Sequence, residues 1–207
     1  MNTITAITGH AKTGKTYFAN HLDIEKKLLS LDIYGDNSIK GAVLRVDVTR
    51  NMRGCMEKVV QQLVTSDVVN RYSTIIFDGF NHILSSVRKE YEKLYGNRCK
   101  KDFDVDFDYN HTINFLVKDQ FIKWFEVLLY QVYDIVLILD DSFIDINWIY
   151  SDIKAFFMMT DWCSWNTVNI FLHTDYNGEV VKRMINYNGN IEEMNSFLYT
   201  YTEKLNE

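Results

Sequence analysis

The sequence contains no proline, only three cysteines and no excess of basic residues. Cys55, Cys99 and Cys163 are widely spaced and odd in number, so they indicate neither a disulfide framework nor a zinc site, and we expect a reducing compartment. Lys and Arg total 22 against 28 Asp and Glu. A chain with this balance is a poor general binder of nucleic acid, because each phosphate contact needs a cation, so any such surface has to be a local patch.

Long apolar runs are also missing. The longest unbroken aliphatic run is Ile135–Leu139, far shorter than the ~20 residues that span a membrane. No charged segment followed by an apolar one opens the chain, so we expect no signal peptide. We therefore expect no membrane partner and a location in the cytoplasm, which is the host cytoplasm if the protein is viral. The many Asn, Lys, Ile, Tyr and Phe residues are typical of an AT-rich genome, which weakens any inference from a single Asn or Tyr.

What is present suits one α/β domain, which we place at 1–207. Hydrophobic residues make up 47% of the chain, enough to bury a core. β-branched or apolar segments predict strands at 3–8, 42–48, 74–77, 134–139, 168–174 and 179–186. Amphipathic periodicity predicts helices at 15–29, from 52 to about 64, from 81 to a stop at Gly96, and at 111–131, 146–160 and 191–205. The segments at 30–41 and 97–110 are expected to be turn-rich or irregular.

The order of these segments predicts the fold class. Strands and helices alternate through the first four strands, which is typical of a three-layer α/β fold with a mainly parallel central sheet. The last two strands flank Asn177-Gly178, a strong hairpin signal, so an antiparallel hairpin is expected at the C-terminal end.

The segment after the first strand matches the pattern G-x-x-x-x-G-K-[ST] in full, between a β-branched strand and a helix. Its members are Gly9, His10, Ala11, Lys12, Thr13, Gly14, Lys15 and Thr16. The glycines let successive N–H groups point inward at phosphate oxygens, and the following helix adds its positive end. We expect Lys15 to bridge the β- and γ-phosphates of ATP and Thr16 to bind Mg²⁺. The alternative is a chance glycine-rich turn.

A phosphate loop also needs a carboxylate for Mg²⁺ at the end of a neighbouring strand. Asp78 follows the apolar segment 74–77 and resembles a Walker B residue, although it could instead cap the next helix. Asp140 ends the segment 135–139 and is a rival; it could polarise the attacking water, contact the γ-phosphate through water, or cap a helix. Asp47, near the end of the second strand, is a candidate general base or a solvated strand-end residue.

Together these segments resemble a RecA-type ATPase core over about 1–187, and especially the small phage ATPases with a minimal RecA core that act in nucleotide binding or single-strand annealing. The resemblance implies ATP with Mg²⁺ at a subunit interface of a homo-oligomer, and work on single-stranded DNA or a DNA-processing protein during recombination. The family's catalytic Glu after the second strand is absent and Asp47 is the nearest carboxylate, while Asp140 takes the sensor position. The resemblance also implies that a basic residue of the late hairpin can reach a neighbour's γ-phosphate. Lys182 and Arg183 are adjacent and point to opposite faces of a strand, so at most one of them does so; a solvated, charged hairpin edge is the alternative.

Two other functions stay open. A small deoxynucleotide or nucleoside kinase fits the length and the phosphate loop, and the segment 185–193 resembles the final strand and helix of such kinases. Kinases need several cations for the transferred phosphate, however, and the region 140–167, which would hold the lid, contains no arginine. A nucleotide-binding scaffold without hydrolysis is the third possibility, because no clear glutamate base is present.

Overall fold

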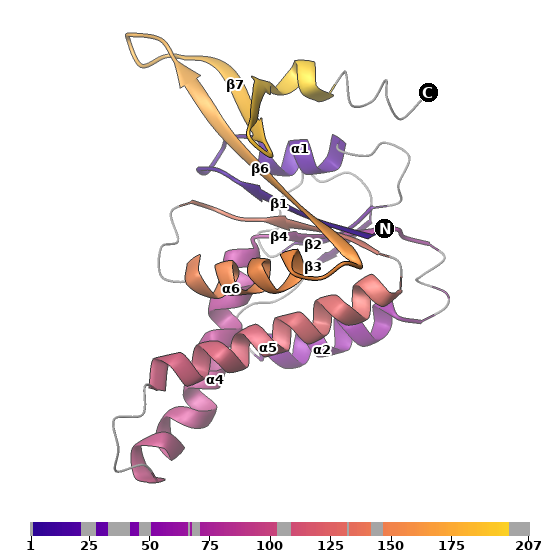
Figure 1. The fold of residues 1–207 in the computed structure, drawn as a ribbon, viewed down its shortest axis with the longest axis vertical. Coiled ribbons are helices and arrows are strands. Elements are labelled where there is room, and N and C mark those ends of the chain that lie inside the picture. The colour runs from indigo at the N-terminus through magenta and orange to yellow at the C-terminus, as the bar shows by residue number, and fades with distance from the viewer. Residues whose placement is uncertain are drawn as a thin grey trace.

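An eight-stranded sheet forms the centre of the protein (Figure 1). The computed structural model describes residues 2–21, 28–32, 42–45, 51–65, 67, 71–102, 109–131, 133–141 and 147–198. Its strands are β1 (Asn2–Thr8), β2 (Leu28–Asp32), β3 (Ala42–Arg45), β4 (Thr74–Asp78), β5 (Asp134–Ile138), β6 (Cys163–Thr174), β7 (Val180–Tyr187) and β8 (Asn190–Glu193). They lie in the order β3-β2-β4-β5-β1-β6-β7-β8, with parallel pairing from β3 to β6 and antiparallel pairing from β6 to β8.

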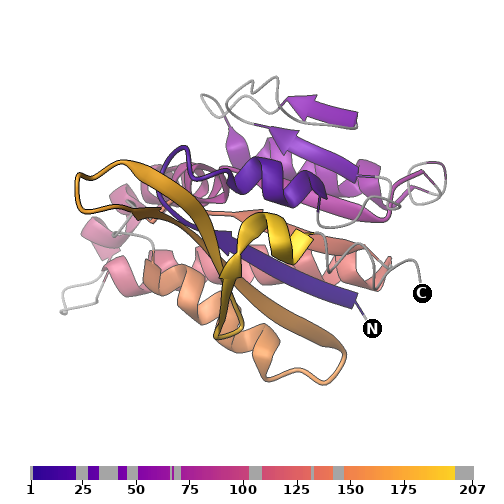
Figure 2. The ribbon, with the colours of Figure 1, turned by 90° about the horizontal axis from the view of Figure 1, so that it is seen from above.

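Helices cover both faces of the sheet, which gives three layers (Figures 1 and 2). The helices are α1 (Lys15–His21), α2 (Met52–Leu63), α4 (Phe80–Asp102), α5 (Tyr109–Tyr130) and α6 (Asn147–Met158), and residues 194–198 form a further helical segment. Helices α2, α4, α5 and α6 share one hydrophobic core with one side of the sheet, whereas α1 and residues 194–198 share a second core with the other side. The predicted α/β fold, with a mainly parallel sheet and a C-terminal hairpin, is therefore confirmed. In the described part of the chain, none of the helices has the length and apolar character that crossing a membrane requires.

The central strands are apolar because they are covered on both faces. All five residues of β4 are buried, and so are the last four of β5. Continuous apolar runs of this kind are typical of parallel strands between two helical layers. The hairpin is different, because the tip that joins β6 to β7 projects beyond the sheet and its residues are largely exposed (Figure 2).

Two predicted boundaries at the N-terminal half are wrong. The segment 28–32 is strand β2, not the end of a helix followed by a turn, because it pairs in parallel with both β3 and β4 and this tertiary pairing outweighs local helical periodicity. Helix α4 continues through Gly96 to Asp102. A glycine inside a helix costs only about 1 kcal/mol, so it need not end one.

Two further boundaries differ near the C-terminal end. Strand β6 begins at Cys163 rather than at residue 168, because its first residues pair with β1 from Asn2 onward. Residues 191–193, predicted as the start of a helix, belong instead to strand β8. The turn before β8 is Asn188-Gly189, with φ angles of 48° and 99°, so the Asn-Gly signal recurs here and makes a second hairpin.

Parallel pairing brings the carboxyl ends of three strands to one edge of the sheet. Strand β5 lies between β1 and β4, with Ile7 beside Ile138 and Phe77 beside Leu137. The segments that follow these strands, at 9–16, 79 and 139–141, therefore meet at the same edge. Ligand sites of open α/β sheets occur at this edge.

Candidate phosphate-binding site

The loop between β1 and α1 has the backbone of a phosphate cradle. Gly9, Lys12 and Gly14 have φ angles of 150°, 64° and 98°, so the chain turns repeatedly into conformations that L-residues seldom adopt. The buried Thr13 supports the curl, because its Oγ1 donates to the carbonyl oxygen of His10 at 3.0 Å. Ala11, the next residue of the loop, borders the cavity that is described below.

Gly9 is required for a second reason, which is crowding. A Cβ atom at this position would lie 2.3 Å from the carbonyl oxygen of Ile170 in β6 and 2.9 Å from Oγ1 of Thr13. The first neighbour is backbone in a paired strand and cannot move aside easily. The loop can therefore approach β6 this closely only with glycine at position 9.

Lys15 lies inside the loop rather than in solvent. Its Nζ donates to the carbonyl oxygens of Gly9 and His10 at 2.6 and 2.7 Å, and lies 3.9 Å from Oδ2 of Asp140. Burial lowers the pKa of Lys15 below its ordinary value, while the negative charges of Asp140, Asp141 and Asp78, in that order, act to raise it. A cation held in this way at the mouth of the loop is placed to meet an anionic ligand.

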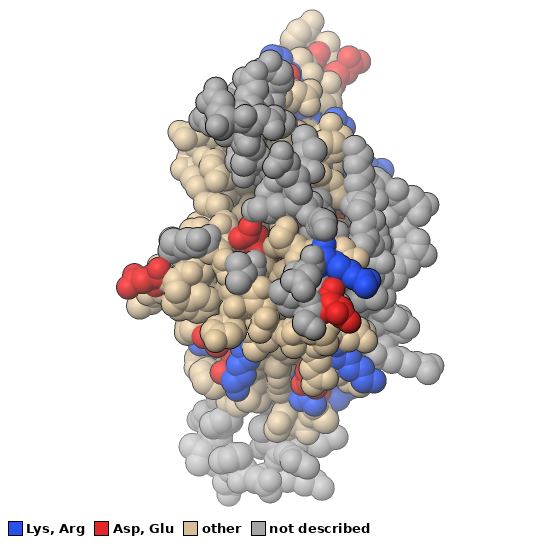
Figure 3. Space-filling model, turned by 90° about the vertical axis from the view of Figure 1, so that its right-hand side faces the viewer, with Lys and Arg blue, Asp and Glu red and all other residues tan. Residues whose placement is uncertain are grey.

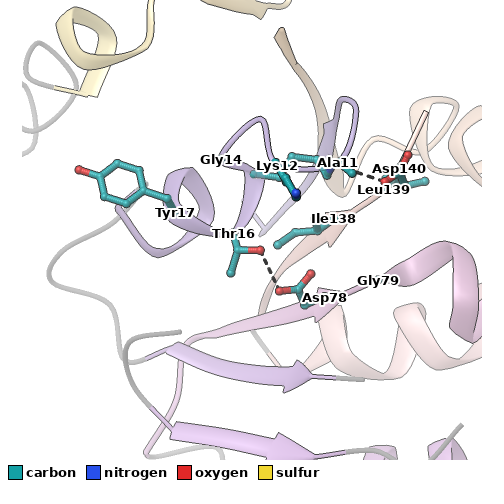
Figure 4. Close-up of a pocket in the computed structure, with 11 residues that line it drawn as sticks. Ala11, Lys12, Gly14, Thr16, Tyr17, Asp78, Gly79, Ile138, Leu139 and Asp140 are labelled. Carbon is teal, nitrogen blue, oxygen red and sulfur yellow. Dashed lines mark hydrogen bonds and ion pairs between the residues drawn. The ribbon is translucent and has the colours of Figure 1, made fainter. Parts of the chain in front are cut away.

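Thr16 and Asp78 are in direct contact. The hydroxyl of Thr16 donates to Oδ2 of Asp78 at 3.0 Å, and Figure 4 shows the two side chains pointing toward one another from α1 and β4. Asp78 is only 4% exposed although it is a carboxylate. The structure thus brings together the two side chains that the sequence predicts as Mg²⁺ ligands.

This pair fits a magnesium ion. A hydroxyl and a carboxylate are the oxygen ligands that Mg²⁺ prefers, and Mg²⁺ usually takes only one or two protein groups besides phosphate and water. No group of three or more His, Cys, Asp or Glu side chains suited to a metal occurs among the described residues. A metal at Thr16 and Asp78 would therefore depend on oxygens from a bound phosphate.

Asp140 lies beside Lys15 and is held by Asn81. The backbone N–H of Asp140 donates to Oδ1 of Asn81 at 2.9 Å, and Nδ2 of Asn81 donates back to the carbonyl oxygen of Asp140 at 3.0 Å. Asn81 is only 4% exposed, so these bonds satisfy a buried amide. They also tie the end of β5 to the start of α4 and so fix Asp140 beside the loop.

These groups line one cavity of about 450 Å³. Its lining includes the second half of the loop, the end of β4 with Asp78 and Gly79, and the end of β5 from Ile138 to Asp140. Tyr17 lies at its border, and its ring points away from the labelled carboxylates (Figure 4). Hydroxyl, carboxylate and ammonium groups thus converge on a space beside a loop of inward-turning backbone.

Most predicted site residues meet here, and one residue, Asn81, was missed. The carboxyl groups of Asp78 and Asp140 both lie beside the loop, the first in contact with Thr16 and the second near Lys15. Asp47, the candidate base, lies outside the described residues. Asn81 was read only as a helix start, since nothing in a single sequence marks an amide as buried. The sequence left Lys182 and Arg183 as alternatives, one of which could reach a neighbour's γ-phosphate, beside a solvated hairpin edge. In the structure the side chain of Arg183 lies against Gly14 of its own chain.

An α/β sheet whose first strand runs into a phosphate loop, with a carboxylate from a neighbouring strand on the loop's Thr, defines a P-loop nucleoside-triphosphatase-type domain. The chain belongs to the AAA domain family, whose model matches residues 1–142. The match includes the loop and both strand-end carboxylates and ends before the C-terminal hairpin. A comparison with curated proteins gave no match. Membership of this family makes the protein a nucleotide-binding domain of ATPase type in general.

Proposed function

We propose that the protein binds ATP with Mg²⁺ and hydrolyses it, as an ATPase of RecA-like type that works in DNA recombination or other DNA metabolism, of a phage in particular. The observation that carries the nucleotide part is the contact between Thr16 and Asp78, 62 positions apart, with Lys15 folded into the loop beside them. The ion would neutralise phosphate charge and orient the scissile group. The DNA role is supported only by resemblance in layout.

Within this proposal each group of the chain has a distinct task. Loop N–H groups and Lys15 hold the phosphates, and Thr16 and Asp78 hold the ion. Asp140, already beside Lys15, senses the terminal phosphate or polarises the attacking water, while Asp47 is the proposed general base. The nucleotide lies at an interface between copies of the chain in this proposal.

In this proposal the surface that contacts single-stranded DNA is a small local patch. On the face shown in Figure 3, the described basic side chains are interspersed with acidic ones rather than gathered in one continuous patch. A single strand of DNA would therefore find no extended basic surface among the described residues on this face, in line with the net charge of −6.

The kinase alternative gains no support from the fold of its tail. Residues 185–193 make the antiparallel β7–β8 hairpin instead of a strand that leads directly into a helix. We therefore retain hydrolysis as the proposed reaction.

The test begins with nucleotide binding, measured by titration with a fluorescent ATP analogue and Mg²⁺. We expect Lys15→Ala to abolish binding, because it removes the cation inside the loop. The control is Lys123→Ala, which removes only an exposed ion pair with Asp119 on α5 and should leave affinity unchanged. Retained micromolar affinity in Lys15→Ala would contradict the phosphate-loop assignment.

The reaction is then followed by product analysis. Wild-type protein is incubated with Mg²⁺-ATP and a panel of nucleoside monophosphates, with and without single-stranded DNA. Release of inorganic phosphate that single-stranded DNA stimulates would support the proposal. Formation of nucleoside diphosphate from a monophosphate would instead establish a kinase, and binding without any turnover would establish a scaffold.

A further inference from the structure

Strand β7 presents two adjacent cations to two different environments. Lys182 donates to Oε2 of Glu193 in β8 at 2.8 Å, so its charge is compensated within the hairpin. Arg183 points to the opposite face, which it shares with Ile185. Ile185 is fully buried in the smaller core together with Phe18 of α1. The face of β7 that carries Arg183 is therefore the face turned toward α1 and the phosphate loop.

The side chain of Arg183 reaches the loop itself. A Cβ atom at Gly14 would lie 3.7 Å from both Cδ and Nε of Arg183, which is ordinary van der Waals contact. Gly14 immediately precedes Lys15 and Thr16, and all three line the cavity. Among the residues that the structure describes, no carboxylate forms an ion pair with Arg183, in contrast to Lys182. An exposed guanidinium thus lies on the turn that would hold phosphate.

The charge of the cavity favours such a cation. The charged residues that line it are Lys12, Lys15, Asp78 and Asp140, whose charges cancel, and Asp141 also acts on Lys15. A nucleotide polyphosphate remains anionic even with Mg²⁺ bound. One further cation beside the loop therefore improves the electrostatic balance of the complex.

We propose that Arg183 is a nucleotide-binding residue that acts in its own chain, by donating hydrogen bonds from its guanidinium to the phosphates held at Gly14. A planar guanidinium suits phosphate oxygens, with which it can form paired hydrogen bonds. This assignment rests on the proposed nucleotide binding. It differs from the expectation that the hairpin serves the site of a neighbouring subunit.

The first experiment measures affinity for fluorescent ATP and ADP in Arg183→Ala and Arg183→Lys, with Lys182→Ala as the matched control on the same strand. We expect Arg183→Ala to weaken both affinities about tenfold, the effect of one charge-assisted contact at a partly solvated site. Arg183→Lys should recover part of the loss, and the salt dependence of binding should become shallower only in Arg183→Ala. Lys182→Ala should stay within about twofold, since its lost partner is an exposed surface pair.

The second experiment separates action within the chain from action on a neighbour. Arg183→Ala and Lys15→Ala proteins are mixed, and ATP turnover is compared with that of each alone. Action within one chain predicts no recovery, because no chain then has both residues. Recovered turnover would show that Arg183 is supplied by a neighbour and would overturn the assignment.

The outcomes also distinguish this inference from the function on which it rests. Wild-type protein that binds ATP, with equal affinity in Arg183→Ala, would overturn the role of Arg183 alone. Wild-type protein that fails to bind any nucleotide would overturn both.

Discussion

The hydrophobic cores on the two faces of the sheet differ greatly in size. On one face α2, α4, α5 and α6 enclose a large core, in which the rings of Phe77, Phe80 and Phe121 pack at tilted or edge-to-face angles against that of Phe125. On the other face, within the part of the chain that the structure describes, α1, part of the hairpin and residues 194–198 cover a smaller core. The phosphate loop leads into α1, so the proposed chemistry lies at the edge of the thinly covered face.

We therefore expect the helical face to supply most of the stability and the other face to hold the ligand site. Burial of apolar area is the main source of folding free energy, so the helical face should dominate stability. The thin face contributes less burial, and the loop and the hairpin lie there within reach of a ligand. The three predictions below follow in order of the expected change in the free energy of unfolding.

The largest effect is expected from Phe125→Ala in α5. Phe125 is fully buried, and removing its ring should lower the free energy of unfolding by about 3–5 kcal/mol. ATP affinity per folded molecule should not change, because Phe125 does not line the cavity beside the phosphate loop. Urea denaturation and nucleotide titration measure the two quantities. Phe115→Ala on the same helix is the control, since Phe115 is 54% exposed and should cost no more than about 0.5 kcal/mol. Equal costs for the two variants would contradict the claim that burial in the large core dominates stability.

An intermediate effect is expected from Gly9→Ala on the thin face. The added Cβ would meet the carbonyl oxygen of Ile170, and relieving that overlap should cost about 1–3 kcal/mol of stability and displace the loop, so that ATP binding is lost. The control is Gly178→Ala in the hairpin turn, where φ is also positive but nothing lies within 4 Å. That variant should cost only about 1 kcal/mol, from the left-handed conformation, and should bind ATP normally. Normal binding by Gly9→Ala would show that crowding does not shape the loop.

The smallest effect on stability is expected from Asp78→Asn, because an amide of the same shape can still accept a hydrogen bond from the hydroxyl of Thr16. Unfolding free energy should change by no more than about 1 kcal/mol. Mg²⁺-dependent turnover should fall roughly 100-fold, since a metal ion contributes several kcal/mol to a phosphoryl transition state. Turnover is measured over a range of Mg²⁺ concentrations, with Asp140→Asn beside it. If Asp78→Asn keeps its Mg²⁺ dependence and Asp140→Asn loses it, the metal role belongs to Asp140.

Features that depend on local sequence were predicted well. The loop at 9–16, the strands around it and the Asn177-Gly178 hairpin were all identified, because turn chemistry and short-range periodicity determine them. Three of the four wrong boundaries lie where distant segments decide the outcome, and the fourth is the helix end expected at Gly96. Residues 28–32 are a strand because β3 and β4 flank them, and residues 190–193 are a strand because β7 lies beside them.

The sequence by itself determined that this protein has a phosphate loop in an α/β fold, since contiguous residues specify the loop and the period of apolar positions specifies the fold class. Only the tertiary structure decided that Asp78 meets Thr16, that Asn81 holds Asp140, and that Arg183 lies on Gly14. Each of these contacts joins residues 59 or more positions apart. The physical reason is that such contacts depend on strand order and register, which are set by the packing of the whole sheet rather than by any local segment.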